Sequence, residues 1–379
     1  METDSLAHKT TPASKQARKP PFRVLCIEGG GMRGVYSASY LDAMLTRYSA
    51  TRKVTHIDLG KAFQLICGTS TGAILACALA ADVRMSKVID LYRNQGPKIF
   101  PEKVPSSLAK ILLQFGRRPA LNRAGAAALE AALTAELKTT KLIDIWTDRG
   151  IGLAVPAVEM SRHRSWVFKT PHLENSKHRD DDYTLVDVCM ATTAAPVFRS
   201  VAWLPNPKMQ GGHAFVDGGL WANNPILVGL TDALELTEPG DAIEIFCLGT
   251  CPPPSGDQIT PALVDRGYKQ WRFGADAAAV SISAQQYAFD HIARMMGKHT
   301  GRVLSIYRFP HGDIAGAMLD HLDLDETSKA SMDALVQQGQ TDAYEALSAC
   351  GDDKSEIGRA IDGLLRHAPE SKAKRGKDV

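Results

Sequence analysis

Short apolar runs alternate along the chain with longer stretches of helical character. The run Phe63–Cys67 is short and mostly apolar and ends at a glycine, which is typical of a buried strand. Runs of the same kind predict strands at FRVLCIE (22–28), FQLIC (63–67), IGLAVPAVEM (151–160), SWVFKT (165–170), HAFVD (213–217) and AIEIFCLGT (242–250).

Helices are predicted between these strands. Ala73–Ala81 is rich in alanine and leucine, which favour helices. Another helix starts at Asn224-Pro225, because asparagine is a good N-cap and proline suits the first turn. Val35–Tyr48 and Leu185–Ala194 are also predicted to be helical. The alternation of strands and helices predicts a three-layer α/β fold, with a mostly parallel central sheet flanked by helices.

Two regions depart from this alternation. Residues 97–150 are expected to form a helical insertion or lid, because they include the alanine-rich stretch RAGAAALEAALTAELK. Residues 251–350 contain three consecutive prolines and are then mainly helical in pattern, with one possible strand at 302–309. They are expected to pack as an extension on a core formed by residues 22–250.

Composition narrows the class of protein. The chain has 379 residues, of which 44% are hydrophobic and 23% charged, as in a soluble globular enzyme. Its net charge of +2 argues against a dedicated nucleic-acid-binding protein. The seven cysteines lie mostly in apolar stretches without zinc-site spacing, which indicates a reduced compartment and implies no metal or other cofactor. The polar start resembles no signal peptide and no window is long and apolar enough to span a bilayer, so a cytoplasmic location is expected.

The first candidate for chemistry is GTSTG, at the turn from the strand at 63–67 into the following helix. Gly68 and Gly72 let this turn take a strained conformation that exposes the Ser70 hydroxyl beside a helix N-terminus. The pattern therefore indicates a nucleophilic serine. An ordinary glycine-rich turn remains the alternative.

The second candidate is the glycine loop EGGGMRG, Glu28 to Gly34, between the first strand and the first helix. A dinucleotide-binding loop would need an acid after the second strand, where this chain has Cys67-Gly68-Thr69. A phosphate-binding loop would need Gly-Lys-Ser/Thr, which is absent. The favoured role is an oxyanion hole formed by backbone amides, with Arg33 holding the loop or a lipid phosphate.

The third candidate is DGG, where Asp217 ends a predicted strand and Gly218 and Gly219 follow. Asp-Gly at a strand end is often only a turn. An aspartate with apolar surroundings at that position is equally suited to act as a general base.

Taken together, EGGGMRG, GTSTG and DGG, with ATTAAPVF between the second and third, resemble the motifs of the patatin-like phospholipases. The resemblance extends roughly from Phe22 to Thr250 and implies a lipid acyl hydrolase. It implies that Ser70 is the nucleophile and Asp217 its base. It further implies an oxyanion hole at Gly29, Gly30 and Gly31, supported by Arg33, Gly34, Gly68, Gly72, Gly218 and Gly219.

The sequence departs from the family at Glu28, where the family usually has aspartate; this position is not expected to be catalytic. None of the eleven histidines lies in a recognisable motif. His172 and its neighbours lie in a polar stretch and are expected to be solvated. The resemblance implies that Asp217 contacts the serine hydroxyl directly, as a dyad without histidine.

The segment SSLAKILLQFGRRP (106–119) combines apolar and basic residues and is a candidate membrane-binding helix, or else an ordinary helix packed on the core. The basic ends, a disordered arm at 1–21 and a tail at 371–379, add a weak attraction to anionic lipid. The active protein is thus expected to bind peripherally to the inner face of the membrane.

Three functions are compatible with these residues. The first is a phospholipase, and the second is the same enzyme as a bacterial antiphage effector that a cyclic nucleotide activates. The third is a nucleotide-binding module that uses GGGMRG without hydrolysis. The partners are then membrane phospholipids and a cyclic nucleotide, and a homo-oligomer is left open.

Overall fold

The protein is described here by a computed structural model that covers residues 19–104, 114, 116–251, 259–267, 270–271, 274–310, 316–352 and 354–372. Most of the candidate membrane-binding segment 106–119 lies outside the described residues, and so do most of the basic ends 1–21 and 371–379.

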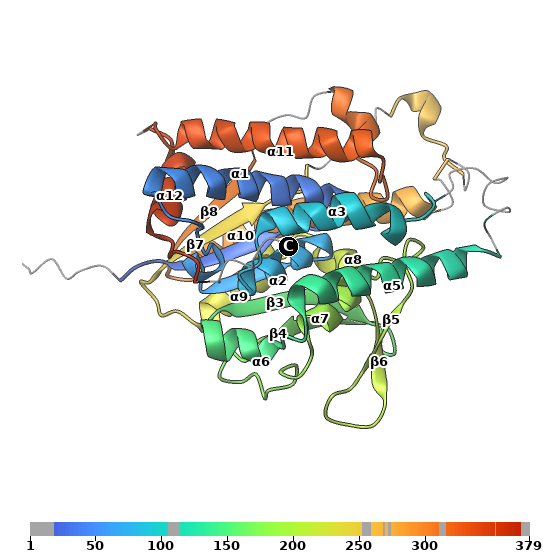
Figure 1. Ribbon diagram of the computed structural model, residues 1–379, viewed down its shortest axis with the longest axis horizontal. Coiled ribbons are helices and arrows are strands. Elements are labelled where there is room, and N and C mark those ends of the chain that lie inside the picture. Colours follow the sequence, from blue (N-terminus) through green and yellow to red (C-terminus); the bar gives the residue numbers. More distant parts are fainter. Residues whose placement is uncertain are drawn as a thin grey trace, which may run out of the picture.

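An eight-stranded sheet forms the middle of the molecule (Figure 1). Its order is β5-β6-β3-β2-β1-β7-β8, with β4 paired to β3. The pairings from β3 through β2, β1 and β7 to β8 are all parallel, whereas β4, β5 and β6 join as antiparallel strands. The predicted mostly parallel sheet is confirmed; β5 was not predicted, because it is only four residues long and ends at a proline. The strands are β1 Phe22–Ile27, β2 Leu65–Gly68, β3 Gly152–Glu159, β4 Arg164–Lys169, β5 Ala202–Pro205, β6 Gly212–Asp217, β7 Ala242–Leu248 and β8 Val303–Phe309.

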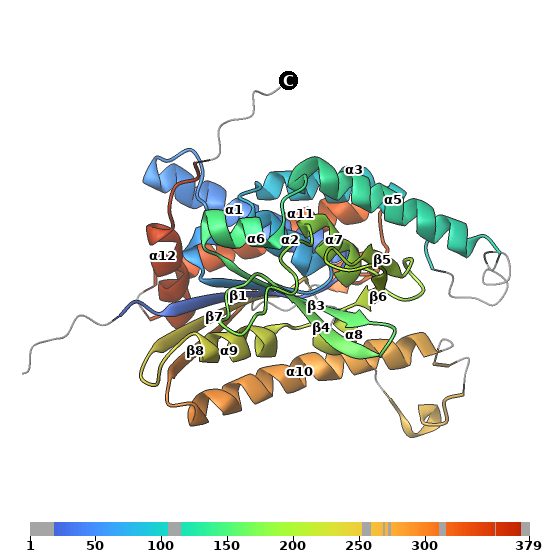
Figure 2. The ribbon, with the colours of Figure 1, turned by 90° about the horizontal axis from the view of Figure 1, so that it is seen from below.

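Helices cover both faces of this sheet, which gives the predicted three layers (Figure 2). The helices α8, α9 and α10 lie on one face, and the other long helices lie on the opposite face. Within the described residues, no helix is both long and apolar enough to cross a membrane. The helices are α1 Gly34–Arg52, α2 Thr71–Ala80, α3 Met85–Ile99, α5 Arg118–Leu137, α6 Leu142–Asp144, α7 Leu185–Thr192, α8 Gly219–Ala222, α9 Ile226–Glu235, α10 Ala275–His299, α11 Lys329–Ala349 and α12 Glu356–His367.

The central strands are buried on both faces, because successive side chains point to opposite sides. In β1, Leu25 and Ile27 belong to the larger core cluster under α1, α2, α3, α7 and α11. Val24 and Cys26 belong to the smaller cluster under α9. A side chain at Gly229 of α9 would press on Val24 and Cys26, so this glycine lets α9 approach the sheet closely.

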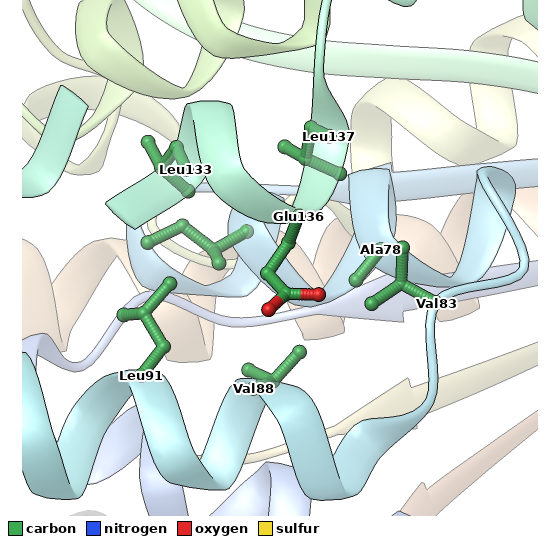
Figure 3. Close-up of a pocket in the computed structure, with 8 residues that line it drawn as sticks. Ala78, Val83, Val88, Leu91, Leu133, Glu136 and Leu137 are labelled. Carbon is green, nitrogen blue, oxygen red and sulfur yellow. The ribbon is translucent and has the colours of Figure 1, made fainter. Parts of the chain in front are cut away.

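Among the described residues of 97–150, the longest helix is α5. The second half of α5 is part of the core rather than a loose cover, because Leu133 and Leu137 are buried. Figure 3 shows these two leucines facing Val88 and Leu91 of α3. The cavity left between α2, α3 and α5 is only about 10 Å³, so the contact is nearly filled. A lid function for the insertion stays a prediction.

The region 251–350 contributes to the sheet and to both helical layers. Its strand β8 pairs with β7 from Val303 to Phe309 and forms one edge of the sheet. The helix α11 lies along α1, and α10 covers the opposite face (Figures 1 and 2). The helical expectation for this region and the possible strand at 302–309 therefore agree with the described residues.

Candidate active site

The serine turn lies between β2, which ends at Gly68, and α2, which begins at Thr71. Ser70 has φ 54° and ψ −125°, a conformation that is strained for a residue with a side chain. A side chain at Gly68 would collide with the backbone of Gly72, and one at Gly72 would collide with the backbone of Ile27. The tight turn at Ser70 therefore leaves no room for a side chain at either glycine.

Asp217 reaches Ser70 because the ends of β2 and β6 lie close together along one edge of β3. Cys67 of β2 pairs with Ala154, and Asp217 of β6 pairs with Ala157 three residues further along β3. Since β4 pairs with both of these alanines from the other side, β2 and β6 share one edge of β3 and approach each other end to end. The Ser70 hydroxyl donates a hydrogen bond of 2.6 Å to Asp217 Oδ2. The predicted pair is therefore in contact.

The surroundings of Asp217 favour its action as a general base. The residue is only 6% exposed, and burial raises the pKa of its carboxyl to about 6. Hydrogen bonds from Ser70 and from the Gly219 amide, at 2.7 Å to Oδ1, oppose the rise, as does the charge of Arg199. Gly218 has no room for a side chain against the backbone of β3. A carboxylate with a pKa nearer to neutrality accepts a proton from a hydroxyl more readily than one at the usual value near 4.

Two side chains of this site were not predicted. Thr192 Oγ1 accepts a hydrogen bond of 2.9 Å from the Ser70 amide and donates one of 2.6 Å to the Pro156 carbonyl, so it fixes the serine turn to β3. Arg199 is buried beside Asp217, and its Nε has no hydrogen-bond partner within the described residues. Their only signal in the sequence is position: Thr192 lies inside ATTAAPVF, and Arg199 follows it directly.

The three amides predicted as an oxyanion hole lie in different surroundings. The Gly29 amide donates to the Asn223 carbonyl at 3.1 Å, so in this conformation it is not available to a substrate. The Gly30 amide donates to the Thr71 hydroxyl at 3.0 Å, a group that can rotate away. For the Gly31 amide, no acceptor is found in the part of the chain that the structure describes. The oxyanion role itself stays a prediction, and Gly31 is the residue of the three whose amide has no acceptor among the described residues.

Arg33 holds the glycine loop in place. Its Nε donates to the Gly30 carbonyl at 3.2 Å, and the side chain is buried, which lowers the pKa of the guanidinium to about 10. Gly34 starts α1, and a side chain there would collide with the Tyr92 ring. The first of the two predicted roles for Arg33, support of the loop, agrees with these contacts; binding of a lipid phosphate stays a prediction.

Glu28 anchors the start of the same loop. It is 4% exposed; its Oε1 accepts from Arg308 Nη1 at 2.5 Å and its Oε2 from Gln286 Nε2 at 3.3 Å. Arg308 also donates to both oxygens of Asp290, at 2.6 and 2.9 Å. Burial raises the pKa of Glu28, and Arg308 opposes that shift. Local sequence carries no signal for this network, because its members lie directly after β1, in α10 and in β8.

The expectation that His172 is solvated is wrong. His172 is 5% exposed, and its ring lies between the Thr170 hydroxyl at 2.7 Å and Asp232 at 3.1 Å. Lys169 donates to the same aspartate at 2.6 Å. Across the described residues, no histidine is hydrogen-bonded to Ser70 or to its carboxylate partner. The polar sequence around His172 concealed a buried partner on α9.

Comparisons with known proteins place the chain among similar sequences. Residues 25–230 match the family model described as "Patatin-like phospholipase". A "cGAMP-activated phospholipase" of Pseudomonas aeruginosa is 35% identical over 278 residues, which cover 73% of this chain and 75% of that protein. Proteins of the same name are 32% identical in Vibrio cholerae (58% of this chain, 59% of that protein) and 29% identical in Escherichia coli (85% and 88%).

Proposed function

The chain belongs to the patatin-like phospholipase family, and on that basis we propose that it hydrolyses the carboxylic esters of glycerophospholipids through a dyad of Ser70 and Asp217. The observation that carries the proposal is the hydrogen bond of 2.6 Å from Ser70 Oγ to Asp217 Oδ2, which lies at a strained turn. Nucleophile and base are already within the distance that proton transfer requires.

In the proposed mechanism, Asp217 accepts the hydroxyl proton while Ser70 Oγ attacks the ester carbonyl. Transfer during the attack avoids a free alkoxide, which a carboxylate could not generate by itself. The negative charge that develops on the carbonyl oxygen is stabilised by the Gly31 amide, and by the Gly30 amide once the Thr71 hydroxyl has turned away. Asp217 then gives this proton to the leaving oxygen as the intermediate collapses, which releases the lysophospholipid and leaves an acyl group on Ser70. Asp217 next accepts a proton from water as the water attacks the acyl group, and returns it to Ser70 Oγ when the fatty acid leaves.

A group of exposed apolar side chains supports contact with a lipid surface. Val197 and Leu220 lie on either side of Asp217 in the sequence, and the β5–β6 hairpin between them projects from the body of the molecule (Figure 1). Arg118, at the start of α5, donates to the Val197 carbonyl, so basic residues border this surface. We propose that this face meets the membrane. Its exposed apolar residues are Val197, Val201, Trp203, Met209 and Leu220.

Regulation by a cyclic nucleotide is proposed from the relatives, each of which bears the name cGAMP-activated phospholipase. In this proposal the protein is inactive in the cytoplasm until the nucleotide binds, and then degrades the inner face of the membrane as an effector of antiphage defence. An unregulated phospholipase is the second candidate, which the catalytic geometry supports equally.

One experiment tests these proposals. Vesicles of phosphatidylethanolamine and phosphatidylglycerol are incubated with the protein, with and without cyclic GMP–AMP, and products are identified by mass spectrometry. Fatty acid and lysophospholipid are expected with the nucleotide, and none from Ser70→Ala. Equal release without nucleotide would favour the unregulated enzyme. Nucleotide binding without hydrolysis of any ester would instead indicate a binding module.

A further inference from the structure

A cavity of about 170 Å³ lies between α1, α11, α12 and the end of β8, apart from the catalytic pair. Its wall is aromatic and aliphatic, and none of the described residues that line it is a lysine, arginine or histidine. Two carboxylates and one phenol hydroxyl supply its polar groups. The lining residues that matter here are Tyr40, Phe309, Asp342, Glu345, Ile357 and Ile361.

Hydrogen-bonding groups in this cavity are left without partners. Tyr40 is 1% exposed, and its hydroxyl has no partner within the described residues. Asp342 accepts from Tyr36 at 2.5 Å and from Gln338 at 2.7 Å, which leaves about two of the four acceptor positions of a carboxylate unused. For the exposed carboxylate of Glu345, no partner is found in the described part of the chain. A buried hydroxyl without a partner destabilises the fold, so a ligand that pairs with it would remove that cost.

The lining selects a ligand of one chemical class. Tyr40 and Phe309 are stacked, with ring centroids 5.7 Å apart and planes inclined by 23°. Carboxylates accept N–H donors and repel phosphate, and the described lining residues include no cation that would offset that repulsion. A planar heteroaromatic ring that carries N–H groups satisfies both conditions, and purine bases have this character. We propose that this cavity binds a purine base of the activating nucleotide, with the sugar and phosphates outside; the inference rests on the proposed regulation by a nucleotide.

The cavity is connected to the glycine loop by two routes. Tyr36, which is hydrogen-bonded to Asp342, lies in the first turn of α1, directly after the loop. The Leu324 carbonyl, just before α11, accepts from the Met32 amide at 2.9 Å and leaves no room for a side chain at Gly31. The helices α1 and α11 lie side by side (Figure 1). A base that changes their spacing would therefore move the Gly31 amide, the predicted oxyanion donor that has no acceptor among the described residues.

The test is a titration of the full chain carrying Ser70→Ala, so that binding is measured without lipid turnover. The probes are cyclic GMP–AMP, adenosine, guanosine and choline. Tyr40→Phe and Glu345→Gln are compared with Glu130→Gln, which removes the same charge as Glu345→Gln from an exposed position on α5. We expect Tyr40→Phe to weaken binding of cyclic GMP–AMP about tenfold, the value of one lost hydrogen bond, and Glu130→Gln to leave it unchanged. A purine nucleoside should compete, and choline should not.

Thermal unfolding separates a ligand contact from a structural role. Without nucleotide, the chain with Tyr40→Phe should unfold at a higher temperature than the same chain with Tyr40 intact, because the unpaired buried hydroxyl is gone. Its affinity for cyclic GMP–AMP should nevertheless be lower. Unchanged affinity in Tyr40→Phe and Glu345→Gln, or competition by choline alone, would overturn the proposal. Hydrolysis of vesicles with no nucleotide binding refutes the cavity assignment and leaves the phospholipase. Binding that depends on Tyr40 without any ester hydrolysis refutes the phospholipase and leaves the cavity assignment.

Discussion

Two buried carboxylates flank the glycine loop, and they have opposite surroundings. Glu28 follows β1 and Asp217 ends β6, with exposures of 4% and 6%. Burial raises the pKa of both. Glu28, however, is bonded to the Arg308 guanidinium at 2.5 Å, whereas Asp217 is bonded to a neutral hydroxyl and a backbone amide, with Arg199 acting only through its charge.

The difference shows that burial alone does not make a carboxylate a base. The short hydrogen bond from Arg308 opposes the effect of burial on the pKa of Glu28 and holds its carboxyl in place, so Glu28 suits an anchor. Asp217 has the same burial without a bonded cation, so its proton affinity is raised and can be used in the reaction. Substituting the two residues in the same way should therefore have unlike effects.

The largest expected effect is on catalysis. Ser70→Ala and Asp217→Asn are each expected to lower kcat for a soluble short-chain ester by about 10⁴-fold, and the double variant should be no worse, because the two groups act as one unit. Glu28→Gln should keep measurable activity. Hydrolysis of p-nitrophenyl butyrate gives these rates. His213→Ala, at the other end of β6, is the control; a folded histidine variant as inactive as Ser70→Ala would indicate a triad instead.

The second effect is on stability, where replacing the two carboxylates should change the free energy of unfolding in opposite directions. The folded-state pKa of Asp217, about 6, lies above its usual 3.8, so its contribution to stability falls as pH rises from about 4 to about 6. Asp217→Asn should remove this loss and raise the free energy of unfolding at pH 8 by up to about 3 kcal/mol. Glu28→Gln should lower it by about 3 kcal/mol, because Arg308 loses a charged partner. Urea unfolding followed by circular dichroism measures both; the same sign for both variants would contradict the comparison.

The third effect is on pH dependence. Because Asp217 must be ionised to accept a proton, kcat/KM should rise with pH and reach half of its plateau near pH 6. Arg199→Gln removes a positive charge that lowers the pKa of Asp217, so its midpoint should move to higher pH. Arg308→Lys changes the surroundings of Glu28 and Asp290 rather than those of Asp217 and should leave the midpoint in place. Initial rates from pH 4.5 to 9 decide this, and a midpoint that follows Arg308 rather than Arg199 would reverse the assignment.

The smallest effect is expected at Thr192, which positions the serine turn. Thr192→Val keeps the shape but loses the hydrogen bonds to the Ser70 amide and the Pro156 carbonyl. We expect kcat to fall about tenfold and stability to fall by about 1–2 kcal/mol. Thr192→Ser should restore both, since it retains the hydroxyl. Rates and urea midpoints are compared for the two variants; equal loss in Thr192→Ser would assign the effect to the missing methyl group.

The sequence by itself determined the features that depend on neighbouring residues. The turn at Ser70 was predictable because the two glycines that it requires, Gly68 and Gly72, lie within the same five residues as the serine. The layered sheet was predictable because short apolar runs alternate with helices along the chain. Strand and turn geometry follow from backbone sterics and burial, which act over a few residues.

The tertiary structure alone decided which distant groups meet. The ends of β2 and β6 share one edge of β3, and this contact brings Asp217 to Ser70. Only the fold placed Arg308 on Glu28 and bonded the Gly29 amide to Asn223, which removes it from the predicted oxyanion donors. Local patterns contain no record of these contacts, because a hydrogen bond or ion pair depends on the distance between atoms in space rather than along the chain.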